Sequence, residues 1–443
     1  MTHWFHRNPL KATAPQDFDV RKVAMKSDFS KIMGDLRQAR RTLLATFTDP
    51  SASTETMEKA SGAYFSLLLG LINAPSPKPA ETQKKENASE SQSDDKTDGD
   101  KTETLSGEVD QKLKTFFRFK WSQSLWISRP PVVQEDAEYE LVNMGVNVGI
   151  WYTKHAARIS DKQDINMDDA KEVLRSLKIA AGIFKEFKDN RVGRLLVEGD
   201  KTSDLDPRIL DCYITCCQAE AQEVTLARAV EMKHSHHLIS SLSNDTASFF
   251  QRADGHLKAL DQEVVLKWRK YLQLKQAFYK AYAYCYHGET LLGKEKCGDA
   301  IKCLTESEAL SEKCFSLCKE YMSTKGAGST VRPHEHNFYQ RLQRQIRFTL
   351  DKLKRENSFI YFQKVPEVVP DMDLKATYGL VEPEVYSVPD INPSWTSTIY
   401  TGFNVSKNVE NNKKGKKPQK DVDVVPVKEP DIKVTRGSDC TIS

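Results

Sequence analysis

The last four residues are the part of the sequence best suited to a chemical reaction. Cys440-Thr441-Ile442-Ser443 has the C-a-a-X form, in which the cysteine thiol is alkylated by an isoprenoid. A serine in the final position favours farnesyl. We therefore expect a covalent farnesyl group on Cys440 and no other cofactor, with an ordinary unmodified C-terminus as the alternative.

A run of lysines upstream could strengthen such an anchor. One lipid chain holds a protein to a membrane only marginally, so a second signal is needed. Each basic residue near an anionic leaflet adds about 1 kcal/mol, although Asp421 and Asp423 oppose this. A solvated linker is an equally open interpretation of this run. The residues expected near the membrane are Lys413, Lys414, Lys416 and Lys417.

No arrangement of residues predicts catalysis. Glu220 and Glu223 could act as acid and base, but they fit the polar face of a packed helix better. The segment 326–330 lacks the upstream glycine and the lysine of a phosphate-binding loop. We expect no enzyme, and no small-molecule substrate.

Candidate metal ligands are equally sparse. His234, His236 and His237 cluster between two expected helices, where an exposed turn is the simpler interpretation. His3 and His6 are expected to be solvated. The nine cysteines include no paired C-x-x-C knuckles, so reduced, buried thiols of a cytosolic protein are expected and a metal site is not.

The whole chain has a soluble composition. Hydrophobic residues make up 39%, charged residues 29%, and the net charge is +3, which gives no basic field for nucleic acid. No signal peptide is visible, and the apolar run 64–72 is about half the length of a membrane span. We therefore expect a cytosolic protein that contacts membranes only peripherally, through its lipid anchor.

Composition divides the chain into parts. Residues 76–106 are almost free of apolar side chains and are predicted to be a disordered insertion. Residues 376–443 are rich in proline and lysine and are predicted to be a flexible tail. Residues 1–375 are predicted to form one all-α domain. Its helical stripes include Ala137, Leu141, Met144, Val148 and Trp151.

One segment has the spacing of a tetratricopeptide repeat. Tyr284, Gly288, Leu291, Ala300 and Leu304 fit one such unit, with a turn near 296–298. The match predicts antiparallel helix pairs in an elongated body.

Three motifs together resemble the Bro-type domains of the Alix family. They are Asn8-Pro9-Leu10-Lys11-Ala12-Thr13 at the start, Ala219-Glu220-Ala221-Gln222-Glu223-Val224 in the middle, and Asn357-Ser358-Phe359-Ile360-Tyr361 with Val365-Pro366 at the end. They span about 360 residues of the chain. The resemblance implies a banana-shaped helical domain with a tetratricopeptide-like core. It also places the chain beside the short, prenylated members of that family.

The resemblance also implies a partner. Alix-like domains bind the C-terminal amphipathic helix of an ESCRT-III subunit, a charged multivesicular body protein, by laying it in a groove. Carried onto this sequence, the apolar anchors fall on Leu238 and Leu242, which share one helix face. Pattern alone makes both leucines core residues. The resemblance instead implies that they are exposed.

Other family positions are only partly kept. An aromatic position falls on Thr225, where the adjacent Leu226 is expected to compensate. A basic position falls on Lys171, while its companion acid falls on Met167. Arg228, one turn from Thr225, is expected to be a further contact.

The resulting hypothesis is a membrane-tethered adaptor of ESCRT-III on an endosomal or nuclear-envelope surface. A helical scaffold for a different partner is the alternative, and an enzyme assembled from distant residues is a third.

Overall fold

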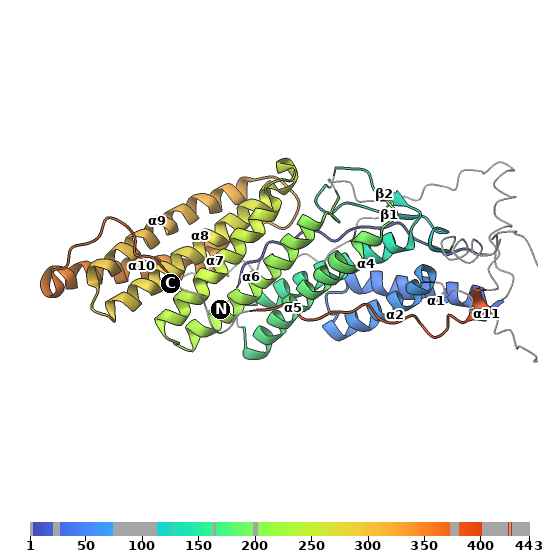
Figure 1. The fold of residues 1–443 in the computed structure, drawn as a ribbon, viewed down its shortest axis with the longest axis horizontal. Coiled ribbons are helices and arrows are strands. Elements are labelled where there is room, and N and C mark those ends of the chain that lie inside the picture. The colour runs from blue at the N-terminus through green and yellow to red at the C-terminus, as the bar shows by residue number, and fades with distance from the viewer. Residues whose placement is uncertain are drawn as a thin grey trace, which may run out of the picture.

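The computed structural model describes residues 3–20, 27–73, 113–126, 128–162, 165–197, 203–372 and 381–400, with 424 and 427. These residues form an elongated, almost wholly helical body (Figure 1). The elements are α1 (Ser27–Thr48), α2 (Thr54–Ile72), β1 (Phe119–Trp121), β2 (Val132–Gln134), α4 (Ala137–Ser160), α5 (Met167–Asn190), η1 (Val192–Arg194), α6 (Pro207–Glu231), α7 (His236–Leu257), α8 (Gln262–Leu292), α9 (Cys297–Ser323), η2 (Pro333–Glu335), α10 (Asn337–Glu356), the π-turn η3 (Asn357–Tyr361) and α11 (Ser397–Tyr400).

Consecutive helices pack against one another from α4 to α10. The connections are short, so neighbouring helices run antiparallel and the row of hairpins grows lengthwise (Figure 1). At the other end, α1 pairs with α2, and α2 packs on α4. The only strands among the described residues are β1 and β2, a short antiparallel pair in which Phe119 faces Gln134. The predicted all-α class is therefore confirmed.

Local sequence signals explain where the helices start. Asp136, Asp206 and Asp261 each accept a backbone N–H in the first turn of α4, α6 and α8. Such caps satisfy N–H groups that the helix itself leaves unpaired. The α8–α9 hairpin is the predicted repeat unit, although its turn occupies 293–296, slightly before the predicted position.

The N-terminal segment runs through the body as an extended, buried chain. Trp4, Phe5 and Lys11 are all buried, and the Asn147 side chain bonds both the N–H and the C=O of Lys11. The expectation that His3 and His6 are solvated is wrong: both are buried. Burial, together with the charge of Lys267, lowers the pKa of His6 to about 3. Its ring is thus a neutral part of the core, bonded to Asn8 and Ser329.

Two carboxylates of α6 are fully buried beneath this segment. Glu220 pairs with Arg7 at 2.8 Å and accepts a hydrogen bond from the Tyr271 hydroxyl at 2.7 Å. Glu223 pairs with Lys275 of α8 at 2.7 Å and lies 2.9 Å from His3 Nδ1.

The surroundings keep the second of these carboxylates charged. Burial alone would raise the pKa of Glu223, but Lys275 and His3 hold it below its ordinary value. The Trp4 ring lies 3.7 Å from Lys275 Nζ and adds a cation–π contact. Glu220 and Glu223 therefore do more than form the polar face of a packed helix. Their ion pairs join α6 to the N-terminal segment and to α8.

Residues 381–400 form an extended segment, here called the strap, that packs along α6, α5 and α2. The Val381 N–H donates to the side-chain oxygen of Gln222, and the Glu384 N–H donates to the Lys178 carbonyl. Further along, Trp395 Nε1 donates to the Leu67 carbonyl. A Cβ on Gly182 would lie 1.9 Å from the Glu384 carbonyl oxygen, so only glycine permits this approach. Residues 381–400 are packed, and the prediction that the flexible tail begins at 376 is wrong for this part.

Several predicted features lie outside the described residues. These are the insertion at 76–106, the boundary at 375, the lysine run and Cys440. The other eight cysteines are free and buried, as predicted. Among the helices that the structure describes, none combines the length and the apolar character needed to cross a bilayer.

Removing one member of the buried pairs should destabilise the fold strongly. Lys275→Met leaves Glu223 with a buried charge and His3 as its remaining ion-pair partner among the described residues. We expect the free energy of unfolding to fall by about 3–5 kcal/mol in urea titrations. The control is Lys270→Met, which removes a partly exposed pair with Glu320 and should cost about 1 kcal/mol or less. Equal effects of the two substitutions would contradict the role given to Glu223.

Candidate partner-binding surface

Helices α6 and α7 are joined by a tight reversal. Lys233 takes the left-handed conformation at φ 55°, and the His234 N–H bonds back to the Ala229 carbonyl. Ser235 then caps α7, its hydroxyl accepting the Leu238 N–H. The end of α6 therefore lies beside the start of α7. The three histidines of this reversal are exposed, as predicted.

Helix α5 brings a third end to the same edge. It begins at a capping box in which Asn166 and Asp169 bond each other's backbone N–H. Because α5 and α6 pack antiparallel, the first turns of α5 lie against the last turns of α6 (Figure 1).

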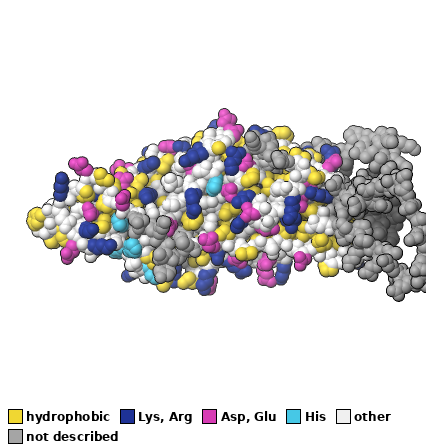
Figure 2. Space-filling model, viewed as in Figure 1, with side chains coloured by type: hydrophobic (Ala, Val, Ile, Leu, Met, Phe, Trp, Pro, Cys, Tyr) yellow, Lys and Arg dark blue, Asp and Glu magenta, His cyan; other side chains and the backbone are white. Residues whose placement is uncertain are grey.

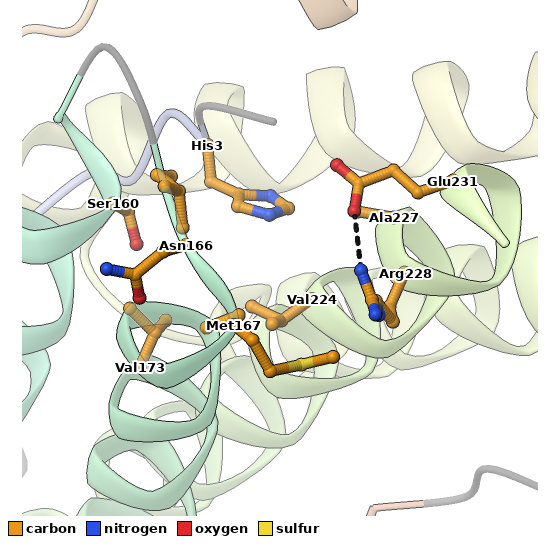
Figure 3. A pocket seen from close by; sticks show the side chains of 11 residues that line it. His3, Ser160, Asn166, Met167, Val173, Val224, Ala227, Arg228 and Glu231 are labelled. Atoms are coloured by element: carbon orange, nitrogen blue, oxygen red, sulfur yellow. Dashed lines mark hydrogen bonds and ion pairs between the residues drawn. The ribbon is translucent and has the colours of Figure 1, made fainter.

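A pocket opens between these two helix ends (Figure 3). Its empty volume is about 440 Å³, counting the solvent at its mouth. The wall is mostly apolar, with Arg228 and Glu231 at one side and the His3 ring among the lining groups (Figure 3). The helical part of the wall consists of Met167, Ala170 and Val173 from α5 with Val224, Ala227, Arg228 and Glu231 from α6.

Arg228 is the cation of this pocket. Its guanidinium lies 3.4 Å from Glu231 Oε2, one turn further along α6 (Figure 3). Its Nε is buried and, within the part of the chain that the structure describes, has no hydrogen-bond partner. A buried N–H without an acceptor costs about 1–3 kcal/mol, so an incoming carboxylate or carbonyl at this point would be favourable.

Two methionines and a leucine supply exposed apolar surface around the pocket. Met167 is 43% exposed and Met232, one turn beyond Arg228, is 56% exposed. Leu238 in the first turn of α7 is half-buried and packs against the core. Methionine is flexible and polarisable, and it is common on surfaces that adapt to a partner. Met232 is not among the residues predicted from the sequence, although an apolar residue directly after the last turn of α6 is a signal that could have found it.

The structure corrects two predicted contacts. Leu242 is only 2% exposed, and Leu226 is fully buried. Leu242 continues the core stripe of Ile239 and Phe250, because α7 lies between α6 and α8 and that face is covered. Leu238 shares this face but lies at the end of the helix, where fewer neighbours cover it.

The remaining predicted residues flank the pocket. Lys171 is exposed and pairs loosely with Asp168 at 3.1 Å. Thr225 is half-buried and its hydroxyl bonds the Ala221 carbonyl, so it offers no apolar anchor. Val224 beside it lines the pocket instead. The edge formed by α5, α6 and α7 thus carries Lys171, Thr225, Arg228 and Leu238. Leu226 and Leu242 lie in the core instead.

Comparison with known proteins gives consistent matches. The family model described as BRO1-like domain matches residues 104–402. The mouse protein named BRO1 domain-containing protein BROX is 47% identical over 418 residues, 94% of each chain. A Caenorhabditis elegans homologue of that name is 36% identical over 429 residues, 96% of this chain and 95% of that protein.

A solved structure shares the fold at lower identity. The complex titled "ALIX BRO1 CHMP4C complex" superposes with a TM-score of 0.62 at 17% identity, covering 88% of this chain and 96% of that one. At this identity the likeness concerns the fold alone. The family match ends at 402, which agrees with the strap being part of the domain.

The two leucines of α7 should respond differently to truncation. Leu242→Ala removes a fully packed side chain and should lower the free energy of unfolding by about 2–5 kcal/mol. Leu238→Ala, made at a half-covered position four residues earlier, should cost about 1 kcal/mol. Thermal and urea denaturation of the two variants provide the measurement. A larger loss for Leu238 than for Leu242 would contradict the placement of α7.

Proposed function

Because the chain belongs to the BRO1-like domain family, we propose that it is a non-catalytic adaptor for ESCRT-III. In this proposal the edge formed by α5, α6 and α7 binds the C-terminal amphipathic helix of a charged multivesicular body protein. The carrying observation is the pocket between α5 and α6, which has mostly apolar walls and is bordered by Arg228. The buried Nε of Arg228 has no hydrogen-bond partner among the residues that the structure describes.

The chemistry of the edge suits an acidic amphipathic helix. Apolar side chains spaced three and four residues apart on the ligand would contact Met167, Met232 and Leu238. Carboxylates beside them would meet Arg228 and Lys171. Charge-assisted bonds of this kind contribute about 1.5–3 kcal/mol each when shielded from water, so Arg228 should matter more than the exposed Lys171.

A related complex supports the choice of partner. The structure titled as a complex of the ALIX BRO1 domain with CHMP4C has the same fold. The edge of this chain differs from the Alix pattern at Thr225 and Met167, so subunit preference need not be the same. A scaffold that binds a different helix through the same edge is the alternative, and the binding experiment below distinguishes the two.

We further propose that the tail tethers the adaptor to membranes. The Cys440 thiolate would form a thioether with C1 of farnesyl diphosphate, with loss of diphosphate and of the thiol proton. A single farnesyl gives reversible attachment, to which Lys413, Lys414, Lys416 and Lys417 would add attraction to an anionic leaflet. The proposed location is the cytosolic face of endosomal or nuclear-envelope membranes.

Charge reversal at the pocket should weaken peptide binding. Arg228→Glu places a carboxylate where the ligand's own acids are expected, and should weaken the Kd for charged multivesicular body protein C-terminal peptides at least about tenfold, which is about 1.4 kcal/mol. Isothermal titration of the full chain against the panel of such peptides is the measurement. Arg252→Glu is the matched control, because Arg252 lies exposed on α7 over Phe249 and its reversal should leave the Kd unchanged.

Two results would count against the partner assignment. Unaltered affinity in Arg228→Glu would move the binding site elsewhere. Wild-type protein that binds no peptide of the panel, yet is folded, would favour the scaffold alternative.

Loss of the lipid should release the protein from membranes. Cys440→Ser removes the only thiol in the C-a-a-X sequence, and the protein should move from the membrane pellet to the supernatant on fractionation of cells. Intact mass of the wild-type protein should show an added farnesyl. An unmodified mass, or a pellet fraction that is the same for both proteins, would rule out the tether.

A further inference from the structure

The end of the molecule formed by α10, η3 and the α8–α9 turn carries large exposed apolar side chains. Phe359, Ile360 and Phe362 are 78%, 65% and 75% exposed. Phe348, on the outer side of α10 about three turns earlier, is 74% exposed. We call these four residues the aromatic tip. Helix α10 runs toward the left-hand end of the molecule in Figure 1, and hydrophobic atoms are visible at that end in Figure 2.

The tip is held rigidly in this exposed arrangement. Asn357 exchanges two hydrogen bonds with the backbone of Gln363, both 2.9 Å. The Gln363 side chain donates to the Glu295 carbonyl and accepts from the Gly298 N–H. These bonds fasten the turn to the start of α9, and Phe362 takes a left-handed conformation at φ 48° between them. The apolar side chains therefore project outward from a fixed backbone.

Basic residues surround the aromatic tip. Residues 341–364 contain seven Lys and Arg against two acids, Asp351 and Glu356. All seven cations are exposed: Arg341, Arg344, Arg347, Lys352, Lys354, Arg355 and Lys364.

The adjoining α8–α9 turn does not cancel this charge. The turn and the start of α9 contribute two cations, Lys294 and Lys296, and two acids, Glu295 and Asp299, so their charges balance. One internal pair reduces the field slightly, since Lys352 lies 3.6 Å from Glu356. The local excess of positive charge contrasts with the nearly neutral chain as a whole.

We propose that the aromatic tip docks on an anionic membrane surface. Aromatic and aliphatic side chains that protrude from a basic rim match a lipid interface, where rings enter the headgroup region and cations meet lipid phosphates and carboxylates. A helical partner would call for a groove, and the tip is convex and protruding. The surface is separate from the α5–α6–α7 edge, so it goes beyond the proposed adaptor function and does not depend on the farnesyl group.

The test uses the full chain carrying Cys440→Ser, so that no covalent farnesyl group contributes to vesicle binding. We expect it to sediment with vesicles of phosphatidylcholine containing about one third phosphatidylserine, and far less with pure phosphatidylcholine. Phe359→Asp with Ile360→Asp should reduce the partition coefficient at least about tenfold, because two inserted side chains become anions. Lys354→Glu with Arg355→Glu should remove the preference for phosphatidylserine.

Val385→Asp is the matched control. Val385 is 97% exposed on the strap, and its substitution should leave vesicle binding unchanged. Circular dichroism should show the same helix content in every variant, since the four tip positions are already exposed to water. Equal binding of the chain to both kinds of vesicle, or full binding by the Phe359 and Ile360 double variant, would overturn the proposal. So would a tip-dependent dimer in sedimentation that binds neither vesicle.

Discussion

The structure depends on neutralising carboxylates that its helices bury. Glu220 and Glu223 stand on one side of α6 with no access to water, and an unpaired charge there would be too costly for the fold. Arg7 and Lys275 supply the opposite charges from the N-terminal segment and from α8. The same solution recurs in α4, where Glu140 accepts bonds from Arg40, Tyr64 and Trp121. Segments distant in sequence are thereby fixed to the central helices.

This constraint reaches the candidate site through α6. Glu223 directly precedes Val224, and Arg228 follows little more than one turn later, so the part of α6 that lines the pocket is held by the ion pairs below it. His3 takes part in both places, since it bonds Glu223 and lines the pocket. This fixed part of α6 contrasts with the flexible, exposed side chains of Met167 and Met232. A fixed helix beside adaptable methionines suits the proposed binding of helices that vary in sequence.

Sequence reasoning succeeded where a local pattern determines the structure. Helical periodicity predicted the all-α body, and the buried face of α4 followed from its unbroken apolar stripes. It failed where long-range packing decides exposure. Leu238 and Leu242 are equivalent by spacing, and only the coverage of α7 by its neighbours separates them. His3 and His6 look solvated because nothing in a short N-terminal stretch reveals that it threads between helices. The prolines of the strap exclude helix and therefore predict a tail, but an extended chain can still pack where Gly182 and Gly70 leave room for it.

Hydrogen–deuterium exchange of the full chain with and without a charged multivesicular body protein C-terminal peptide tests the central claim most directly. Backbone amides near a docked helix become protected, and the position of the protection identifies the surface. The account predicts added protection in the first turns of α5, the last turns of α6 and the first turn of α7, with no change in α10 or η3. Protection confined to any other face, or none at saturating peptide, would contradict it.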